Sequence, residues 1–134
     1  MDTTERILRE LRTIAVVGAS RDPAKAAHAI PAKMQQAGFR IVPVNPQVDE
    51  LLGEKAYPKL ADIPFPIDLV LVFRPSAEAE AIARDAVAID ARELWLQQGI
   101  TSAEAKQLAE AADMLYVEDH CIGVERAILG ITKA

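Results

Sequence analysis

Five short apolar runs along the chain predict β-strands, and segments with apolar residues at spacings of three and four separate them. The run at 69–73 is apolar throughout, which is typical of a parallel strand covered on both faces. The run at 40–44 contains Pro43, which cannot donate a backbone hydrogen bond, so this strand is expected at or near a sheet edge. The predicted strands are 13–17, 40–44, 69–73, 93–97 and 114–117.

Helices are predicted between these strands. Pro31 lies inside the second helix, and because proline is tolerated in a first helical turn, this helix is expected to begin shortly before it. Ser76 is expected to cap the next helix, and Thr101 with Glu104 has the pattern of a capping box. The segment 47–66 is weakly patterned, with helical turns expected near 49–52 and near Leu60. The predicted helices cover about 3–11, the region before Gly38, 79–86, 101–112 and 123–131.

Strict alternation of strands and helices predicts a single α/β domain over residues 1–134. Buried strands separated by helices imply a parallel sheet joined by right-handed crossovers. We therefore predict a three-layer Rossmann-like fold, with a five-stranded parallel sheet in the order 3-2-1-4-5 and helices on both faces. A flavodoxin-like strand order is the alternative.

The composition narrows the range of partners. With 134 residues, 51% hydrophobic and 26% charged, the chain has the profile of a soluble globular protein. Its net charge of −5, with both signs mixed throughout, argues against nucleic-acid binding. No apolar run approaches the roughly 20 residues that span a membrane. The acidic first residues do not resemble a signal peptide, and the single cysteine, Cys121, fits a cytoplasmic location.

The first predicted strand ends at Gly18, and small or polar residues follow it. This arrangement is typical of a phosphate-binding turn, because backbone can approach the anion at a glycine and the next helix begins with partial positive charge. In an open parallel sheet, ligands bind where the strand order reverses, which is expected here between the first and fourth strands. The residues delivered to that edge are Gly18-Ala19-Ser20, Asn45-Pro46, Phe73-Arg74-Pro75 and Gln97-Gln98-Gly99-Ile100.

The dinucleotide-binding fingerprint is only partly present. Ser20 and Pro23 stand where the pattern G-x-G-x-x-G has its second and third glycines. Asn45 ends the second strand, where an NAD-binding protein has a carboxylate for the ribose. Both departures count against NAD. The simpler alternative, a tight strand-to-helix turn without a ligand, stays open.

Several motifs occur together in the chain: Val17–Ser20, Asp22-Pro23, Pro43–Pro46, Val72–Arg74, Leu94–Gln97, Gly99-Ile100 and Asp119-x-Cys121. Together they resemble the small stand-alone CoA-binding domain family of bacteria, which is similar to the N-terminal domain of the succinyl-CoA synthetase α subunit. The resemblance covers nearly the whole chain. Asp90 and Asp113 depart from it, because the family usually ends these helices with glycine; aspartate tolerates left-handed backbone, so stability is affected more than the ligand.

The resemblance implies binding of coenzyme A or an acyl-CoA and a role in acyl-CoA metabolism. The pyrophosphate would lie on Gly18-Ala19-Ser20. The adenine and its ribose would lie between Val44-Asn45-Pro46 and Phe73-Arg74-Pro75, and the pantetheine arm would run toward Gln97 and Gly99. The synthetases phosphorylate a histidine of a separate domain, which these 134 residues do not contain.

Ser20 and the charged residues near the turn each have two interpretations. Ser20 can donate to a phosphate or cap the following helix, since both roles use the same position. Arg74 can bind a phosphate, such as the 3′-phosphate of CoA, or form an ion pair with Asp22 or Glu78. Arg21 and Lys25 are either solvated charges or phosphate ligands.

Three further residues, His28, Trp95 and Cys121, are of interest. His28 either begins the helix after the phosphate turn or contacts the ligand. Trp95 lies within a predicted strand and is expected in the core. Cys121 follows the last strand, where it is either a packing residue or a nucleophilic thiol able to form a mixed disulfide with CoA.

No catalytic set of residues and no metal-ligand spacing is recognisable. The leading hypothesis is therefore a non-catalytic CoA-binding module. The alternatives are an NAD(P)-binding redox protein or sensor with a degenerate fingerprint, and a protein-interaction domain that has lost its ligand. A protein partner is left open.

Overall fold

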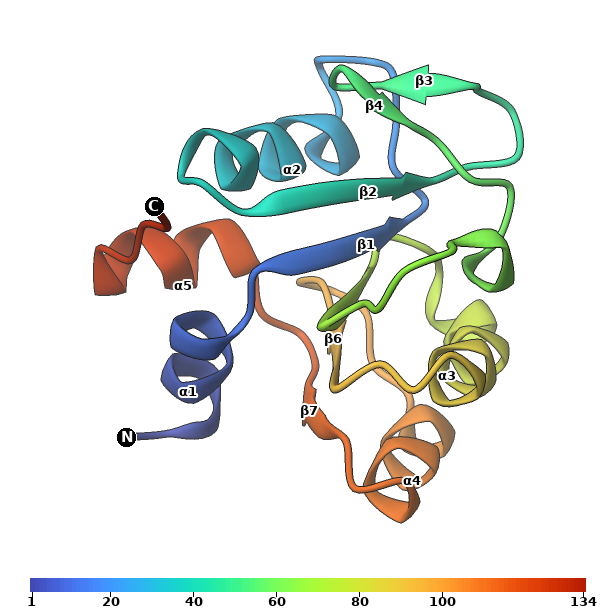
Figure 1. The fold of residues 1–134 in the computed structure, drawn as a ribbon. Coiled ribbons are helices and arrows are strands. Elements are labelled where there is room, and N and C mark those ends of the chain that lie inside the picture. The colour runs from blue at the N-terminus through green and yellow to red at the C-terminus, as the bar shows by residue number, and fades with distance from the viewer.

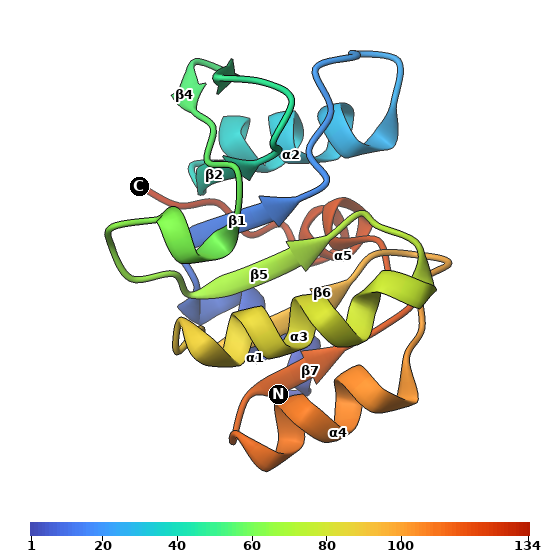
Figure 2. The same ribbon diagram turned by 90° about the vertical axis from the view of Figure 1, so that its right-hand side faces the viewer.

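Five parallel strands form the central sheet of the computed structural model, which describes residues 1–134. The sheet order is β2-β1-β5-β6-β7. Figure 1 shows β2 beside β1, and Figure 2 shows β5, β6 and β7 following β1. The five-stranded α/β fold with helices on both faces is thus confirmed. The strands are β1 (Thr13–Val17), β2 (Arg40–Val44), β5 (Leu69–Val72), β6 (Glu93–Leu96) and β7 (Leu115–Val117).

The predicted order 3-2-1-4-5 is wrong, and the flavodoxin-like alternative 2-1-3-4-5 is observed. The third of the five strands, β5, pairs with β1 rather than with the outer side of β2. That outer side holds only an isolated parallel bridge between Val44 and Tyr57. There the Tyr57 N–H donates to the Pro43 carbonyl, so the missing N–H of Pro43 faces the sparsely paired edge. A single bridge thus replaces the outer strand, and β2 is an edge strand as Pro43 predicted.

Two apolar clusters lie on opposite faces of this sheet, because neighbouring residues of each strand point to opposite sides. One cluster joins Ala15, Val70 and Leu94 to α3 (Ala79–Ala88) and α4 (Ala103–Ala111), which lie side by side in Figure 2. The other joins Ile14, Leu71 and Trp95 to the three remaining helices. These are α1 (Thr3–Glu10), α2 (Ala26–Gln36) and α5 (Ile122–Leu129).

Trp95 is fully buried, which confirms its predicted place in the core. Asp90 and Asp113 follow α3 and α4 with φ values of 57° and 59°, so both aspartates do adopt the left-handed backbone expected of them. None of the helices combines the length and the apolar character needed to cross a bilayer.

The segment after β2 differs from its prediction. A short hairpin, β3 (Glu50–Leu51) and β4 (Glu54–Lys55), replaces the helical turn expected near 49–52. Its two turn residues, Leu52 and Gly53, both have positive φ (55° and 74°), as a type I′ turn requires, and leucine rarely adopts such a φ. The turn expected near Leu60 is present as the 3-10 helix η1 (Leu60–Asp62).

Two predicted helix caps are also wrong. The residue that caps α4 is Ser102, whose hydroxyl accepts the amide of Ala105, rather than Thr101. Ser76 begins a 3-10 turn, η2 (Ser76–Glu78), before α3, and its hydroxyl accepts the amide of Thr101 at 3.1 Å. The two serines therefore stabilise neighbouring connections, which side-chain pattern alone does not distinguish.

Candidate nucleotide site at the carboxyl edge of the sheet

The chain leaves β1 and β5 toward opposite faces of the sheet, because α2 follows β1 and α3 follows β5. Such a reversal between neighbouring parallel strands leaves a crevice at their carboxyl ends. A cavity of about 690 Å³ opens at this point. The crevice therefore lies between β1 and β5. It was expected between the first and fourth predicted strands, which β5 separates in the structure.

Most of the predicted binding residues line this cavity. They come from the β1–α2 connection, from the end of β2 and from the residues after β5. Since these three segments are far apart in the sequence, the fold is what brings them together. The predicted residues in the lining are Gly18, Ala19, Ser20, Arg21, Lys25, Val44, Asn45, Pro46, Phe73 and Arg74.

The turn after β1 approaches its neighbours so closely that only glycine fits at its start. Gly18 has a φ of +88°, and a Cβ there would lie 2.9 Å from the Phe73 carbonyl oxygen and 2.8 Å from Arg74 Cδ. The Gly18 amide donates to the Val44 carbonyl at 3.2 Å. The Asn45 side chain then donates from Nδ2 to the Ala19 carbonyl at 2.8 Å. Asn45 thus holds the turn in place from the neighbouring strand.

Ser20 is held by α2 through both of its backbone groups. Pro31 lies inside α2, further from the helix start than predicted, and has no N–H to donate to the Ala27 carbonyl. That carbonyl instead accepts the Ser20 amide at 3.1 Å. The Ser20 carbonyl accepts a hydrogen bond of 2.7 Å from His28, which fixes the proton of the imidazole on Nδ1. Pro31 and His28 therefore position the turn.

Hydrogen-bond donors without a partner in the protein gather beside this turn. The amides of Ala19, Ala26 and Ala27 have no acceptor; the latter two belong to the first turn of α2. The Ser20 hydroxyl accepts the Asp22 amide at 3.1 Å and keeps its own proton to donate. With the positive end of the helix dipole, these groups form a setting suited to an anion.

Arg74 lines the cavity and forms an ion pair with Glu78, which also lines it. Its guanidinium donates to both carboxylate oxygens, at 3.2 Å and 2.8 Å. These hydrogen bonds raise the pKa of Arg74 and lower the pKa of Glu78. Of the alternatives weighed for Arg74, the ion pair with Glu78 is the one present. Both side chains are about half exposed, so the pair can exchange partners when an anion arrives.

The cavity is positively charged although the chain carries a net charge of −5. Arg21, Lys25 and Arg74 line it, and Glu78 is its only acidic residue. Apolar side chains, among them Phe73, form the remaining walls. The combination suits a ligand that carries both phosphates and a flat apolar group.

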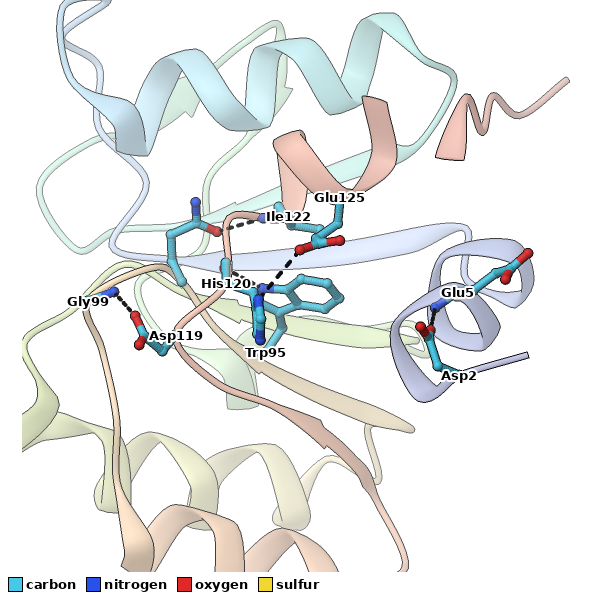
Figure 3. A network of polar contacts seen from close by, with 9 residues as sticks. Asp2, Glu5, Trp95, Gly99, Asp119, His120, Ile122 and Glu125 are labelled. Atoms are coloured by element: carbon cyan, nitrogen blue, oxygen red, sulfur yellow. Dashed lines mark hydrogen bonds and ion pairs between the residues drawn. The ribbon is translucent and has the colours of Figure 1, made fainter. Parts of the chain in front are cut away.

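Four predicted site residues lie outside the cavity: His28, Pro75, Gln97 and Gly99. Gln97 and Gly99 follow β6, which β5 separates from β1, and this is the consequence of the observed strand order. Gln97 is buried, and its Oε1 accepts the Ile122 amide that begins α5. The Gly99 amide donates to Asp119 at 2.7 Å, as Figure 3 shows.

Cys121 is also outside the cavity. It is the N-cap residue of α5 and is partly buried. In the same loop the carbonyl of His120 accepts the indole N–H of Trp95 (Figure 3). These contacts join β6 to the start of α5 and support the interpretation of this region as packing.

Sequence reasoning missed several lining residues. Glu78 is predicted only as a possible ion-pair partner of Arg74, although its place four residues after Arg74 was an available signal that the two side chains share one site. Pro58 and Val48 reach the cavity because the hairpin returns to Val44 through the Tyr57 bridge, which no pattern in 47–66 indicated. The missed lining residues are Val17, Ala27, Gln47, Val48, Pro58, Glu78 and Ile82.

The doubly wound parallel sheet and the crevice at its switch point define an open α/β domain of the kind that binds ligands at the carboxyl ends of its strands. Residues 12–127 match the family described as CoA binding domain. The chain belongs to this family, as the motif resemblance predicted.

The relatives fall into two groups. Protein YneT of Bacillus subtilis, which carries the description uncharacterized, is 40% identical over 92% of each chain. A solved structure from Thermus thermophilus superposes with a TM-score of 0.90 at 35% identity, covering 96% of this chain and 99% of that one. Acetate–CoA ligase (ADP-forming) II of Archaeoglobus fulgidus is 39% identical over 56% of this chain, which is only 12% of the ligase. The match to the ligase is thus confined to a small part of a much longer protein.

Proposed function

We propose that this protein binds coenzyme A or an acyl-CoA at the carboxyl edge of its sheet and performs no chemistry on it. The pyrophosphate is placed on Gly18-Ala19-Ser20. The adenine and its ribose lie between the ends of β2 and β5. The observation that carries the proposal is the convergence of unpartnered amides and three basic side chains in a cavity that also has apolar walls.

Family membership supports coenzyme A as the nucleotide. A segment that matches this chain occurs in proteins named acetate–CoA ligases. The end of β2 supports it as well, because Asn45 uses its side chain to hold the turn and offers no carboxylate to the ribose of NAD. Gln97 and Gly99 do not line the cavity, so the cavity does not support their expected contacts with the pantetheine arm.

The lining of the cavity supports binding without catalysis. It contains no histidine and no cysteine, and its one carboxylate is bonded to Arg74. A general base would need a free group within hydrogen-bond reach of the substrate. We propose a carrier or sensor role in acyl-CoA metabolism, and we place it in the cytoplasm because the one cysteine is unpaired.

Isothermal titration calorimetry of the purified full chain tests this proposal. We expect saturable 1:1 binding of CoA, and weaker binding of 3′-dephospho-CoA because one phosphate is lost. Binding of NADH in place of CoA would instead support the redox alternative. No binding of CoA, acetyl-CoA or a long-chain acyl-CoA would reject the proposal and favour the interaction domain. Native mass spectrometry of fresh protein gives an independent answer through the mass of any nucleotide that copurifies.

A further inference from the structure

A second cavity, of about 320 Å³, lies at the opposite, amino edge of the sheet. It is formed by the end of α1 and by the connections from α3 to β6 and from α4 to β7. It shares no residue with the nucleotide cavity. Its lining comprises Arg6, Glu10, Val87, Asp90, Ala91, Arg92, Glu93, Ala112, Asp113, Met114 and Leu115.

Glu93 is the feature of this cavity that the fold does not explain. It is the first residue of β6 and is only 1% exposed. Its Oε2 atom is buried and has no hydrogen-bond partner in the protein. A buried carboxylate oxygen without a donor is unfavourable, so such a group calls for a partner from outside the chain or for a proton.

The arginines nearby are engaged elsewhere. Arg6 lies 3.6 Å and Arg92 lies 4.0 Å from the carboxylate of Glu10, on the exposed rim of the cavity. Glu93, Asp90 and Asp113 form no ion pair. The acids in the lining outnumber the bases, so the cavity has a negative net charge and favours a cation.

The helix ends add to this preference. The three helices α1, α3 and α4 end at Glu10, Ala88 and Ala111, next to the cavity. Figure 2 shows α3 and α4 ending on the side of the sheet where the strands begin. Helix C-termini carry partial negative charge and carbonyl oxygens that lack a helical donor. Their partial negative charge therefore favours a cation in the cavity.

The lining also indicates which kind of cation fits. No three acidic, histidine or cysteine side chains converge to hold a metal ion. Val87, Ala91, Met114 and Leu115 provide apolar surface instead. The volume equals that of about ten water molecules at roughly 30 Å³ each, which leaves room for a chain of a few carbons.

We propose that the amino-edge cavity binds a small organic cation, namely a primary ammonium group on a short alkyl chain. The ammonium donates to the carboxylate of Glu93, and the methylene groups lie against Val87 and Met114. The site is independent of the nucleotide cavity and of the function proposed for it.

Burial is the main cause that raises the pKa of Glu93 to about 7. The carboxyl groups of Asp68 and Glu10 act in the same direction, and Arg92 and Arg6 act against them. Asp90 and Asp113 are the other titratable groups in the lining. Because only the ionised carboxylate attracts an ammonium strongly, binding should be stronger at pH 8 than at pH 5.5.

Calorimetric titration of the full chain with 1,4-diaminobutane at pH 8 and low salt is the test. We expect saturable binding, weakened at least about tenfold by Glu93→Gln, which keeps the shape but removes the charge. Glu80→Gln, on the exposed face of α3, should leave it unchanged. The neutral analogue 1,4-butanediol should not bind.

A second measurement does not depend on the variant. The diamine should raise the melting temperature of the unmodified protein at pH 8 and have little effect at pH 5.5. Equal affinity of Glu93→Gln and the unmodified protein, equal affinity for the diol, or no binding of the diamine at pH 8 would each overturn the proposal. None of these results bears on whether the protein binds CoA, so the two sites are tested separately.

Discussion

The two edges of the sheet offer opposite electrostatic environments. At the carboxyl edge, the 690 Å³ cavity collects the start of α2 together with Arg21, Lys25 and Arg74. At the amino edge, the 320 Å³ cavity collects three helix ends and the buried carboxyl of Glu93. A parallel sheet with returning helices places helix N-termini at one edge and C-termini at the other, so topology alone biases one edge toward anions and the other toward cations.

The difference between the edges shows why net charge is a poor guide to the ligand. A chain of net charge −5 would be expected to repel a phosphate-rich molecule. The donors close to the cavity determine whether an anion binds there, because the electric field of nearby side chains and amides exceeds that of distant, screened charges. The side chains then strengthen the bias of the fold at each edge, and the predictions below alter one edge at a time.

The largest effect is expected from Gly18→Val at the carboxyl edge. The added side chain would collide with the Phe73 carbonyl and Arg74 and would occupy the proposed pyrophosphate position. We expect CoA binding to fall by more than about a thousandfold, or roughly 4 kcal/mol. Calorimetry measures the loss.

Gly130→Ala is the matched control for that variant. Gly130 also has a positive φ (+64°), but no atom lies within 4 Å of the added Cβ. Both substitutions strain the backbone, so both lower stability, whereas only the change at Gly18 should abolish binding. Retained CoA affinity in a folded Gly18→Val protein would contradict the placement of the pyrophosphate.

At the amino edge, Glu93→Gln should stabilise the protein at alkaline pH. The pKa of Glu93 is about 7 in the folded chain against an ordinary 4.5, so the folded state retains a proton that the unfolded state has lost. The free energy of unfolding contributed by this group therefore falls as pH rises from about 4.5 to about 7 and stays low above that. Replacing the carboxyl should recover on the order of 2 to 3 kcal/mol at pH 8 and little at pH 4.

Urea unfolding at the two pH values measures this difference. If Arg6 or Arg92 paired with Glu93 in solution, the ionised carboxylate would be stabilising, and Glu93→Gln would lower the free energy of unfolding at pH 8 instead. The sign of the change thus shows whether Glu93 has an arginine partner in solution.

A moderate effect is expected from Glu78→Gln, which releases Arg74 from its ion pair. If Arg74 binds a ligand phosphate, the freed guanidinium should raise CoA affinity by about three- to tenfold at low salt, and less at high salt. The gain should shrink when Arg74→Gln is also present, because the carboxylate then has no arginine to hold. An equal gain in both backgrounds would mean that Glu78 acts only as a repelling charge.

How far the sequence predicted these features depends on the range of the interactions that form them. The strands, most helices and the turn at Gly18 follow from local patterns, and most residues delivered by 18–25, 44–46 and 73–74 do line the cavity. The strand order did not follow, because it depends on whether β5 pairs with β1 or with β2, a long-range choice that local patterns do not encode. The misplacement of Gln97 and Gly99 is a direct result of that error.

The amino-edge cavity was not predicted at all. Glu93 has the sequence appearance of an ordinary charged residue at the start of a strand, and nothing local reveals that its carboxyl becomes buried. Burial there depends on the end of α1 and two connections, which meet only in the folded chain. The roles of His28 and Asn45 were missed for the same reason: both contact the backbone of the Gly18–Ser20 turn from distant or helical positions.

The smallest effect is expected from Pro31→Ala. Alanine restores an N–H that would donate to the Ala27 carbonyl within α2, and this carbonyl now accepts the Ser20 amide. The two donors would compete, so the turn should become less fixed while the helix gains a regular hydrogen bond. We expect CoA affinity to fall by about two- to threefold with little loss of stability, and amide hydrogen exchange at Ser20 to accelerate. Pro23→Ala, in the exposed part of the same connection, is the control. Unchanged exchange at Ser20 in Pro31→Ala would show that the loop holds its shape without α2, and that Gly18 and Asn45 alone are sufficient to position the carboxyl-edge donors.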